Sequence, residues 1–379
     1  MQDSKRPETL VEYLRTLRQK GIPENEYEKY MSDYLEFSAR DRAIPLHGTF
    51  ELTPLCNLNC KMCYVHLENS QFTPDRLLSI STWKTIIEGA YNAGMRKASL
   101  TGGECLTYPG FEDVYFFLQE KGIPIGIMTN GILLDSRKVD FFIKNPPKGI
   151  QVTLYGSNDN IYERVTGKRV FNIVFSNIQN VRDAGIPVKI AITPSRFMQD
   201  DLENVLEVAE KLKVPYYINS FLSAPRANTG RKKEDMSIDH YIAIYKKRRS
   251  LHHLDDSKLI DPAELPEPGH GSSKRYGLKC GAGRSSFVAK YDGTISPCCS
   301  LYNIEADPME DGFQAAWEKI NKAAESYVLP VECGSCFYES VCPRCAAMHR
   351  DAPLKGHCDP FVCERTKKFI SAGLIQLPK

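Results

Sequence analysis

The sequence predicts an α/β protein, in which a partial (β/α)6 barrel is followed by a small cysteine-rich α+β domain. Short apolar segments alternate with amphipathic segments from Phe50 onward, which is typical of parallel strands connected by helices. Six such units occur, fewer than the eight of a closed barrel. Beyond residue 276 the long periodic stretches end, and nine of the thirteen cysteines fall between Cys280 and Cys363.

The predicted barrel repeats a strand–helix unit along the chain. We place the strands at residues 49–53, 97–101, 124–129, 149–154, 188–193 and 216–221. We place the helices that follow them at residues 82–93, 111–121, 136–144, 170–184, 202–212 and 238–250. Ser81 and Asp201 are the predicted N-caps of two of these helices. Gly94, Gly122 and Gly185 stand where a helix end favours a left-handed residue.

The segments on either side of the barrel differ from it in composition. Two amphipathic helices are predicted at 8–19 and 24–39, because Gly21-Ile22-Pro23 between them ends one helix and begins the next. We expect these helices to cap the barrel. A stretch rich in proline, glycine and serine before the cysteine-rich region predicts a linker. The predicted division is an N-terminal helical segment at 1–45, the barrel at 46–255, the linker at 256–276 and the cysteine-rich domain at 277–379.

Composition excludes several classes of partner. The formal net charge is only +2 and charges of both signs are interspersed, so we expect no nucleic-acid partner. A run of about 18 apolar residues is missing, and the N-terminus lacks the apolar core of a signal peptide. We therefore expect a cytoplasmic protein without a membrane span. Because the cytosol keeps thiols reduced, the cysteines predict metal ligation and not disulfides.

Three of the cysteines form a motif directly after the first predicted strand. Cys56, Cys60 and Cys63 have the spacing C-x3-C-x2-C. Three thiolates leave one iron of a [4Fe-4S] cluster without a protein ligand, and an open metal position is typical of a reactive site. The alternative is zinc, although zinc sites favour paired C-x2-C knuckles. The motif resembles that of the radical SAM superfamily, in which the open iron holds the amino and carboxylate groups of S-adenosyl-L-methionine.

Residues at the ends of later strands extend this resemblance. Gly102, Gly103 and Glu104 end the second strand, where paired glycines allow a close backbone approach. The triplet is similar to the family segment that binds the amino group of S-adenosylmethionine; the alternative is a simple turn. A proline usually follows this glutamate, and here Cys105 takes its place.

Further resemblances concern the rest of the cofactor. Asn130 ends the third strand and is a predicted cofactor-binding residue. Thr153, in the fourth strand, stands where related enzymes commonly carry a serine whose hydroxyl meets the ribose. Arg164 resembles a family arginine that pairs with the cofactor carboxylate, and its alternative role is a surface helix cap.

The cysteine-rich region carries a second pattern. Asp292-Gly293 between apolar segments predicts a hairpin that brings Cys280 and Cys298 together. The run Cys333-x2-Cys336-x5-Cys342-x2-Cys345 follows, and then Cys363. This order resembles the SPASM extension of radical SAM enzymes that act on peptides. The resemblance implies two auxiliary [4Fe-4S] clusters, the first held by Cys280, Cys298 and Cys345, and the second by Cys333, Cys336, Cys342 and Cys363.

This assignment gives no role to three cysteines and does not settle the fourth ligand of the first auxiliary cluster. The unassigned residues are Cys105, Cys299 and Cys358. Either Cys299 or Cys358 supplies the fourth ligand of the first auxiliary cluster, or that iron stays open for substrate. The alternative for the whole region is a pair of zinc knuckles, because Cys333-x2-Cys336 and Cys342-x2-Cys345 alone suit zinc.

Cys299 is the predicted catalytic residue. In similar sulfatase-maturing enzymes an aspartate proposed as a base follows the cysteine that Cys298 matches, so a thiol here argues against formylglycine formation. Cys299 has three possible roles: a cluster ligand, a hydrogen-atom donor to a substrate radical as in peptide epimerases, or an inert buried cysteine.

Together the resemblances imply a radical SAM/SPASM enzyme that forms a 5′-deoxyadenosyl radical. Its expected cofactors are S-adenosyl-L-methionine and three [4Fe-4S] clusters. A reducing partner such as flavodoxin or ferredoxin is expected, and the expected substrate is a peptide or protein. The products considered are a thioether or carbon–carbon crosslink, a formylglycine or an inverted α-carbon. The alternatives are a radical SAM dehydrogenase or epimerase acting on a small molecule or peptide, and a non-catalytic iron–sulfur electron carrier.

Overall fold

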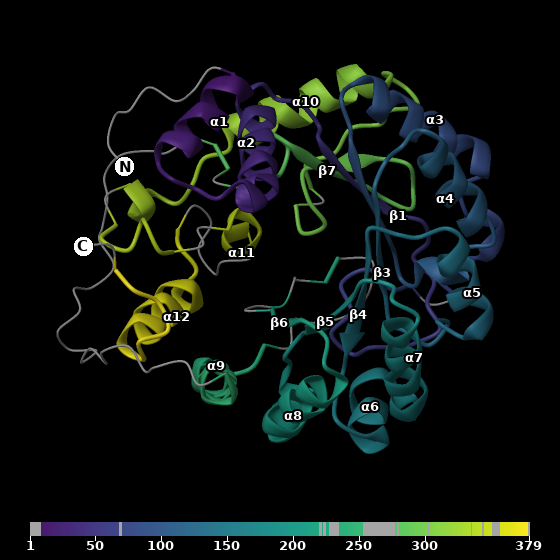
Figure 1. The fold of residues 1–379 in the computed structure, drawn as a ribbon, viewed down its shortest axis with the longest axis vertical. Coiled ribbons are helices and arrows are strands. Elements are labelled where there is room, and N and C mark those ends of the chain that lie inside the picture. The colour runs from purple at the N-terminus through teal and green to yellow at the C-terminus, as the bar shows by residue number, and fades with distance from the viewer. Residues whose placement is uncertain are drawn as a thin grey trace.

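The computed structural model describes residues 9–67, 70–219, 222, 225–226, 235–252, 277–278, 280–301, 303–334, 336–342, 345–350 and 357–377. The strands in these ranges are β1 (His47–Glu51), β2 (Lys97–Thr101), β3 (Ile125–Thr129), β4 (Gly149–Leu154), β5 (Val188–Ile192), β6 (Tyr216–Ile218), β7 (Ser286–Ala289) and β8 (Ile295–Ser296). They form one sheet in the order β6-β5-β4-β3-β2-β1-β7-β8 (Figure 1).

Strands β1 to β6 are parallel neighbours, which confirms the predicted partial barrel. The connecting helices are α3 (Ile80–Asn92), α4 (Phe111–Glu120), α5 (Ser136–Lys144), α6 (Asp159–Thr166), α7 (Phe171–Asp183), α8 (Leu202–Leu212) and α9 (Ile238–Leu251). Figure 1 shows α3 to α8 along the outer side of the curved sheet. Their apolar faces cover the outer face of the sheet, because the faces of a parallel sheet are normally buried.

One local prediction was wrong, and one helix was missed. Helix α3 is capped by Ser79, whose hydroxyl accepts the N–H of Thr82 at 3.1 Å, and not by the predicted Ser81. Helix α6 was not predicted, although Asn158 caps it by accepting the N–H groups of Asn160 and Ile161. The glycines predicted at helix ends, Gly94, Gly122 and Gly185, all have positive φ.

The cysteine-rich region joins the barrel through β7. This strand pairs in parallel with β1, in register from His47↔Ser286 to Phe50↔Ala289, and pairs antiparallel with β8. Gly293 has φ +92° between β7 and β8, which confirms the predicted hairpin. The ring of Phe287 on β7 makes edge contacts with Phe50 and Phe313, at centroid distances of 5.9 and 5.1 Å. The hairpin therefore extends the sheet and shares the barrel core.

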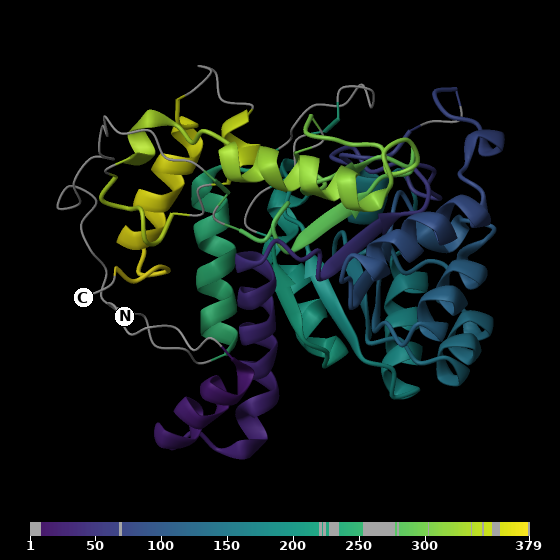
Figure 2. The same cartoon turned by 90° about the horizontal axis from the view of Figure 1, so that it is seen from above.

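The predicted N-terminal helices are present as α1 (Leu10–Gln19) and α2 (Tyr27–Asp41). Figure 2 shows them projecting from one side of the molecule. The Nζ of Lys97, the first residue of β2, donates to Ser32 at 3.3 Å. The Trp317 indole of α10 (Phe313–Ser326) donates to the carbonyl of Ala43 at 2.7 Å. Helix α2 thus meets the barrel at the end of β2 opposite to the predicted cofactor segment.

Two short helices complete the C-terminal region, α11 (Ala346–Arg350) and α12 (Pro360–Ser371). Figure 2 shows them beside α9, away from the outer barrel helices. The predicted linker at 256–276 lies outside the described residues. Among the described helices, none combines the length and the apolar character needed to cross a membrane.

Candidate active site

The three motif cysteines lie at the C-terminal ends of the strands and line one cavity of about 510 Å³. The N–H of Leu58 points at the sulfur of Cys56 at 3.4 Å, and the N–H of His66 at the sulfur of Cys63 at 3.3 Å. Amide donors of this kind stabilise thiolates that ligate metal. Burial is the main reason that the pKa of Cys56 is raised to about 12, so a positive metal centre is needed to hold its thiolate.

The unpredicted helix α6 holds the cysteine loop in place. The N–H of Asn59 donates to the carbonyl of Thr166 at 2.9 Å, and the N–H of Lys61 donates to the carbonyl of Val165 at 3.0 Å. Both acceptors belong to the last turn of α6, where helix carbonyls have no partner within the helix. Gly167 then ends the helix with φ +78°. The loop that carries Cys60 is therefore anchored on the fourth βα connection.

Gly102 and Gly103 let the end of β2 pack against the start of the cysteine loop. A Cβ on Gly102 would lie 2.5 Å from the carbonyl oxygen of Thr53, and one on Gly103 would lie 2.3 Å from that of Leu55. The N–H of Gly103 donates to Thr53 at 2.6 Å. Both glycines also line the cavity. The close approach predicted for this pair is thus made to the chain's own backbone as well as to the cavity.

The carboxylate of Glu104 ties β2 to β3. It is 1% exposed and accepts hydrogen bonds from the N–H of Leu106 at 3.1 Å, the hydroxyl of Thr129 at 2.9 Å and the N–H of Asn130 at 2.8 Å. Burial raises its pKa, and these donors partly offset that effect. The thiol of Cys105 also contacts Oε1 at 3.8 Å, whereas Oε2 accepts only from Asn130 among these donors and keeps a direction for a further cation.

The other predicted cofactor residues divide into two groups. Asn130 and Thr153 line the cavity, and the Asn130 amide donates to Asn57 Oδ1 in the cysteine loop at 2.6 Å. Arg164 instead forms a two-pronged ion pair with Asp200, and 39% of its side chain is exposed. These hydrogen bonds lower the pKa of Asp200. The structure does not place Arg164 among the residues that line the cavity.

Cys299 lines the same cavity as the motif cysteines, although it is more than 230 residues from them in the sequence. It follows β8, and the pairing of β7 with β1 carries it to this end of the barrel. Its neighbour Cys298 packs in a different cluster, together with Cys345. Burial and then the carboxylate of Glu51 raise the pKa of Cys299, so its sulfur stays protonated at neutral pH.

Sequence reasoning missed a buried ion pair beneath this part of the cavity. The Arg226 guanidinium donates to both carboxylate oxygens of Glu51, at 2.9 and 2.7 Å. It also lies 5.7 Å from the ring centroid of Tyr64 and 3.4 Å from the carbonyl of Cys299. A glutamate at the end of an apolar strand was the available signal, because a buried charge requires a partner.

All thirteen cysteines lie in the described part of the chain, and none forms a disulfide. Cys105 is buried in the barrel and its thiol contacts the carbonyl of Met128 at 3.4 Å. Cys280 is exposed. Cys336 and Cys342 pack against Tyr338 and Ile370.

The remaining cysteines gather in the C-terminal region. The sulfurs of Cys358 and Cys363 lie 2.8 Å apart, and Cys333 is close to both. Thiolates crowded in this way fit a site for a soft metal or an iron–sulfur group. Of the four cysteines assigned to the second auxiliary cluster, the described contacts bring Cys333 and Cys363 together.

The partial barrel and its three-cysteine loop are the part of the chain that matches a known family. Residues 50–209 match the family model of the Radical SAM superfamily. The chain is therefore similar to this superfamily over these residues, which make up less than half of its length.

Three relatives resemble more of the chain. The sporulation killing factor maturation protein SkfB of Bacillus subtilis is 25% identical over 277 residues, which are 72% of this chain and 65% of SkfB. The antilisterial bacteriocin subtilosin biosynthesis protein AlbA of the same organism is 25% identical over 291 residues, 72% of this chain and 60% of AlbA. The chain thus spans less than two thirds of both. The AdoMet-dependent heme synthase of Methanosarcina barkeri is 24% identical over 324 residues, which are 79% of this chain and 90% of the heme synthase.

Two solved structures share the fold. Streptococcus suis SuiB bound to the precursor peptide SuiA superposes with a TM-score of 0.61 at 15% identity, over 96% of this chain and 84% of SuiB. The anSMEcpe structure with bound AdoMet superposes with a TM-score of 0.62 at 16% identity, over 86% of this chain and 97% of that protein. At these identities the comparison establishes the fold alone.

Proposed function

We propose that this chain is a radical S-adenosylmethionine enzyme that modifies a peptide or protein. The observation that carries the proposal is the cavity at the strand ends, which is lined by Cys56, Cys60 and Cys63 and also by Cys299 from the cysteine-rich region. Its volume of about 510 Å³ lies within the range of roughly 300–1,000 Å³ of small-molecule pockets. SkfB is a maturation protein, AlbA is a bacteriocin biosynthesis protein, and the SuiB structure contains a precursor peptide. The similarity to these three proteins supports a peptide substrate.

The cavity residues fit a [4Fe-4S] cluster and S-adenosylmethionine. The three cysteines would hold the cluster, whose bound cofactor supplies a 5′-deoxyadenosyl radical. Gly102 and Gly103 would let the cofactor approach the edge of β2, and the free direction of Glu104 would accept from its ammonium group. Asn130 and Thr153 present polar groups to the same cavity. The task of the protein is to hold one substrate C–H bond in position and to exclude water.

Cys299 is proposed as the hydrogen-atom donor to the substrate radical. Its side chain lines the cavity, whereas Cys298 packs with Cys345, so two adjacent residues serve different sites. This separation supports a donor over a fourth ligand of the first auxiliary cluster. A protonated thiol is the form that can give up a hydrogen atom, and burial maintains that form. The transfer would leave a thiyl radical on Cys299, which one electron from the external reductant and one proton from solvent would return to the thiol.

The cysteine-rich region is proposed to be a SPASM-type extension with auxiliary iron–sulfur clusters. Cys298 and Cys345 pack in one cluster of side chains, which supports a shared group for these two. Cys280, also predicted there, is exposed. An external one-electron reductant such as flavodoxin or ferredoxin would supply electrons. A reducing compartment such as the cytoplasm suits thirteen cysteines without a disulfide.

A small-molecule substrate is the second candidate, because the haem synthase relative is covered over most of its length. A non-catalytic electron carrier is not favoured, since a carrier has no need of a cavity that opens onto the three-cysteine loop.

The proposal is tested with a peptide encoded beside the gene for this chain, incubated anaerobically with S-adenosylmethionine and dithionite. An epimerised peptide has the mass of its precursor in ordinary water, so we expect the change in deuterium oxide: a gain of deuterium on the product carbon that requires both reagents. Cys299→Ala should retain iron and cofactor cleavage but form no product. Loss of iron in Cys299→Ala, or product without deuterium, would overturn the donor role. A peptide unchanged by an enzyme that cleaves the cofactor would overturn the choice of substrate.

A further inference from the structure

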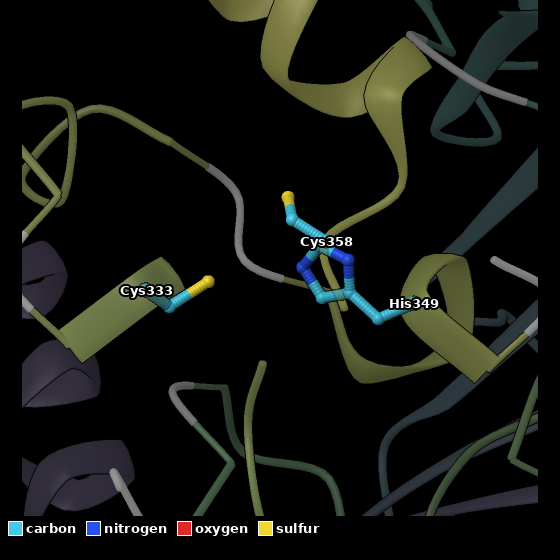
Figure 3. A group of neighbouring side chains, drawn as sticks. All are labelled: Cys333, His349 and Cys358. Atoms are coloured by element: carbon cyan, nitrogen blue, oxygen red, sulfur yellow. The ribbon is translucent and has the colours of Figure 1, made fainter. Parts of the chain in front are cut away.

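A histidine that the sequence analysis did not consider lies at the C-terminal cysteine group. One ring nitrogen of His349, on α11, and the sulfurs of Cys333 and Cys358 all lie within 4.8 Å of one another. Figure 3 shows the imidazole facing the two sulfur atoms. Cys363 adds a third sulfur, 2.8 Å from that of Cys358. Four soft or borderline donors thus meet in one place, and Cys358 is among the cysteines that the resemblance left unassigned.

The chain holds this group together through Glu332. Its carboxylate accepts from the N–H of Cys358 at 3.3 Å and pairs with the ring of His357. Glu332 stands directly before Cys333 in the 3-10 helix Val331–Gly334. A contact between segments 26 residues apart therefore brings Cys358 next to Cys333.

The hydrogen bond at the other ring nitrogen fixes the tautomer of His349. The backbone N–H of Asp359 donates to Nδ1 at 3.2 Å, so Nδ1 carries a lone pair and no hydrogen. A neutral imidazole with an acceptor at Nδ1 has its hydrogen on Nε2. A metal-ligating histidine has the opposite arrangement, because its free nitrogen donates a hydrogen bond. His349 is therefore prepared to donate from Nε2 and not to bind a metal there.

The Nε2–H group lacks a partner among the described residues. His349 is 6% exposed, and its Nε2 is buried without a hydrogen bond. A buried donor without an acceptor is destabilising, so such groups nearly always have a partner. The sulfur atoms of a metal group at Cys333 and Cys358 are acceptors in the direction that the ring faces.

We propose that Cys358 is a ligand, with Cys333 and Cys363, of the C-terminal auxiliary iron–sulfur cluster, and that His349 donates a hydrogen bond from Nε2 to a sulfur of that cluster. The inference rests on the proposed auxiliary clusters and changes their ligand set. Hydrogen bonds to cluster sulfurs stabilise the reduced, more negative state and raise the reduction potential. His349 is thus a positioning residue that tunes the electron acceptor.

The ligand role is tested by iron and zinc analysis of the anaerobically reconstituted full chain. We expect Cys358→Ala to lose about four irons per chain, as one cubane should. The matched control is Cys105→Ala, which removes a buried thiol from the barrel and should keep all its iron. Full iron in Cys358→Ala, or zinc in place of iron in the wild type, overturns the assignment.

The donor role is tested by redox titration followed by electron paramagnetic resonance. We expect His349→Phe to keep its iron and to shift one auxiliary cluster to a more negative potential. His349→Gln, whose amide can donate, should recover most of the wild-type potential. His252→Phe, at the residue that follows α9, should leave the potential unchanged. Loss of iron in both His349 variants would show that His349 is a ligand. An unchanged potential in His349→Phe would show that no hydrogen bond from His349 reaches the cluster. Either result overturns the proposal.

The same preparations separate this inference from the proposed function. Formation of 5′-deoxyadenosine depends on the cluster at Cys56, Cys60 and Cys63. If the wild type cleaves the cofactor, and the His349 and Cys358 variants have the same iron content and reduction potentials as the wild type, only the inference is contradicted. Wild-type protein without auxiliary clusters contradicts the proposed function itself.

Discussion

Arg226 donates two hydrogen bonds to the carboxylate of Glu51, and both side chains are almost completely buried, with 6% and 1% of their surfaces exposed. Glu51 is the last residue of β1, directly before the segment that leads into the cysteine loop. The backbone N–H of Arg226 also donates to the carbonyl of Tyr64 at 3.1 Å, at the end of that loop. The pair therefore fixes both ends of the loop relative to each other and lies against Cys299.

Removing one partner of this pair should destabilise the fold strongly. Arg226→Met leaves the Glu51 carboxylate buried without its counter-charge, and such changes cost about 3–5 kcal/mol in the free energy of unfolding. The double change Glu51→Leu with Arg226→Met should recover much of that loss, since an apolar pair needs no compensation. Urea unfolding at neutral pH measures both.

The matched control is Arg169→Met, because Arg169 and Glu163 form an ion pair with about half of each side chain exposed. It should cost less than about 1 kcal/mol. If Arg226→Met costs no more than Arg169→Met, the buried pair does not organise the loop.

Gly103→Ala should displace the cysteine loop. Its new Cβ would lie 2.3 Å from the backbone carbonyl oxygen of Leu55, a contact that only movement of the backbone can relieve. We expect reconstituted protein to lose iron from the first cluster, close to four atoms per chain. In Gly149→Ala, at the first residue of β4, the nearest atom to the new Cβ is 3.4 Å away, so the iron content of this variant should not change. Equal iron in the two variants would contradict the packing role of Gly103.

Glu104→Gln should affect both stability and cofactor binding. The amide group of glutamine places a donor where Glu104 accepts from Leu106, Thr129 and Asn130, so at least one buried donor loses its acceptor. This costs about 1–3 kcal/mol of unfolding free energy. If the carboxylate also binds the cofactor ammonium, S-adenosylmethionine affinity falls by about 1.5–3 kcal/mol at constant iron content. Isothermal titration calorimetry measures the affinity for S-adenosylmethionine. If the stability falls but this affinity is unchanged, the role of Glu104 is purely structural.

The barrel was predictable because its signals are local. The strand predicted at 149–154 and the helix predicted at 202–212 match β4 and α8 at both ends, since apolar periodicity sets these elements directly. Helix α6 escaped prediction because it spans only two turns, although Asn158 marked its start. The serine that caps α3 was misplaced by two residues, because Ser79 and Ser81 carry the same signal and only the geometry selects one.

The candidate site also contains some features that local sequence patterns specify and others that depend on long-range contacts. The cysteine loop and the glycine pair are short motifs and were found in the sequence. Glu51 and Arg226 are 175 residues apart, and no spacing rule connects them. Cys299 reaches the cavity because β7 pairs with β1, a long-range pairing that local patterns do not specify. Arg164 was assigned by resemblance, and the structure pairs it with Asp200.

The most direct test of the central claim is the formation of 5′-deoxyadenosine by anaerobically reconstituted, dithionite-reduced protein supplied with S-adenosylmethionine. The wild type should hold close to twelve irons, the sum of three cubanes, and should release 5′-deoxyadenosine and methionine. The triple variant Cys56→Ala, Cys60→Ala, Cys63→Ala should hold about four fewer irons and release neither product. Cofactor cleavage that persists in the triple variant would contradict the assignment of these cysteines, and no cleavage by the fully loaded wild type would contradict the proposed radical chemistry.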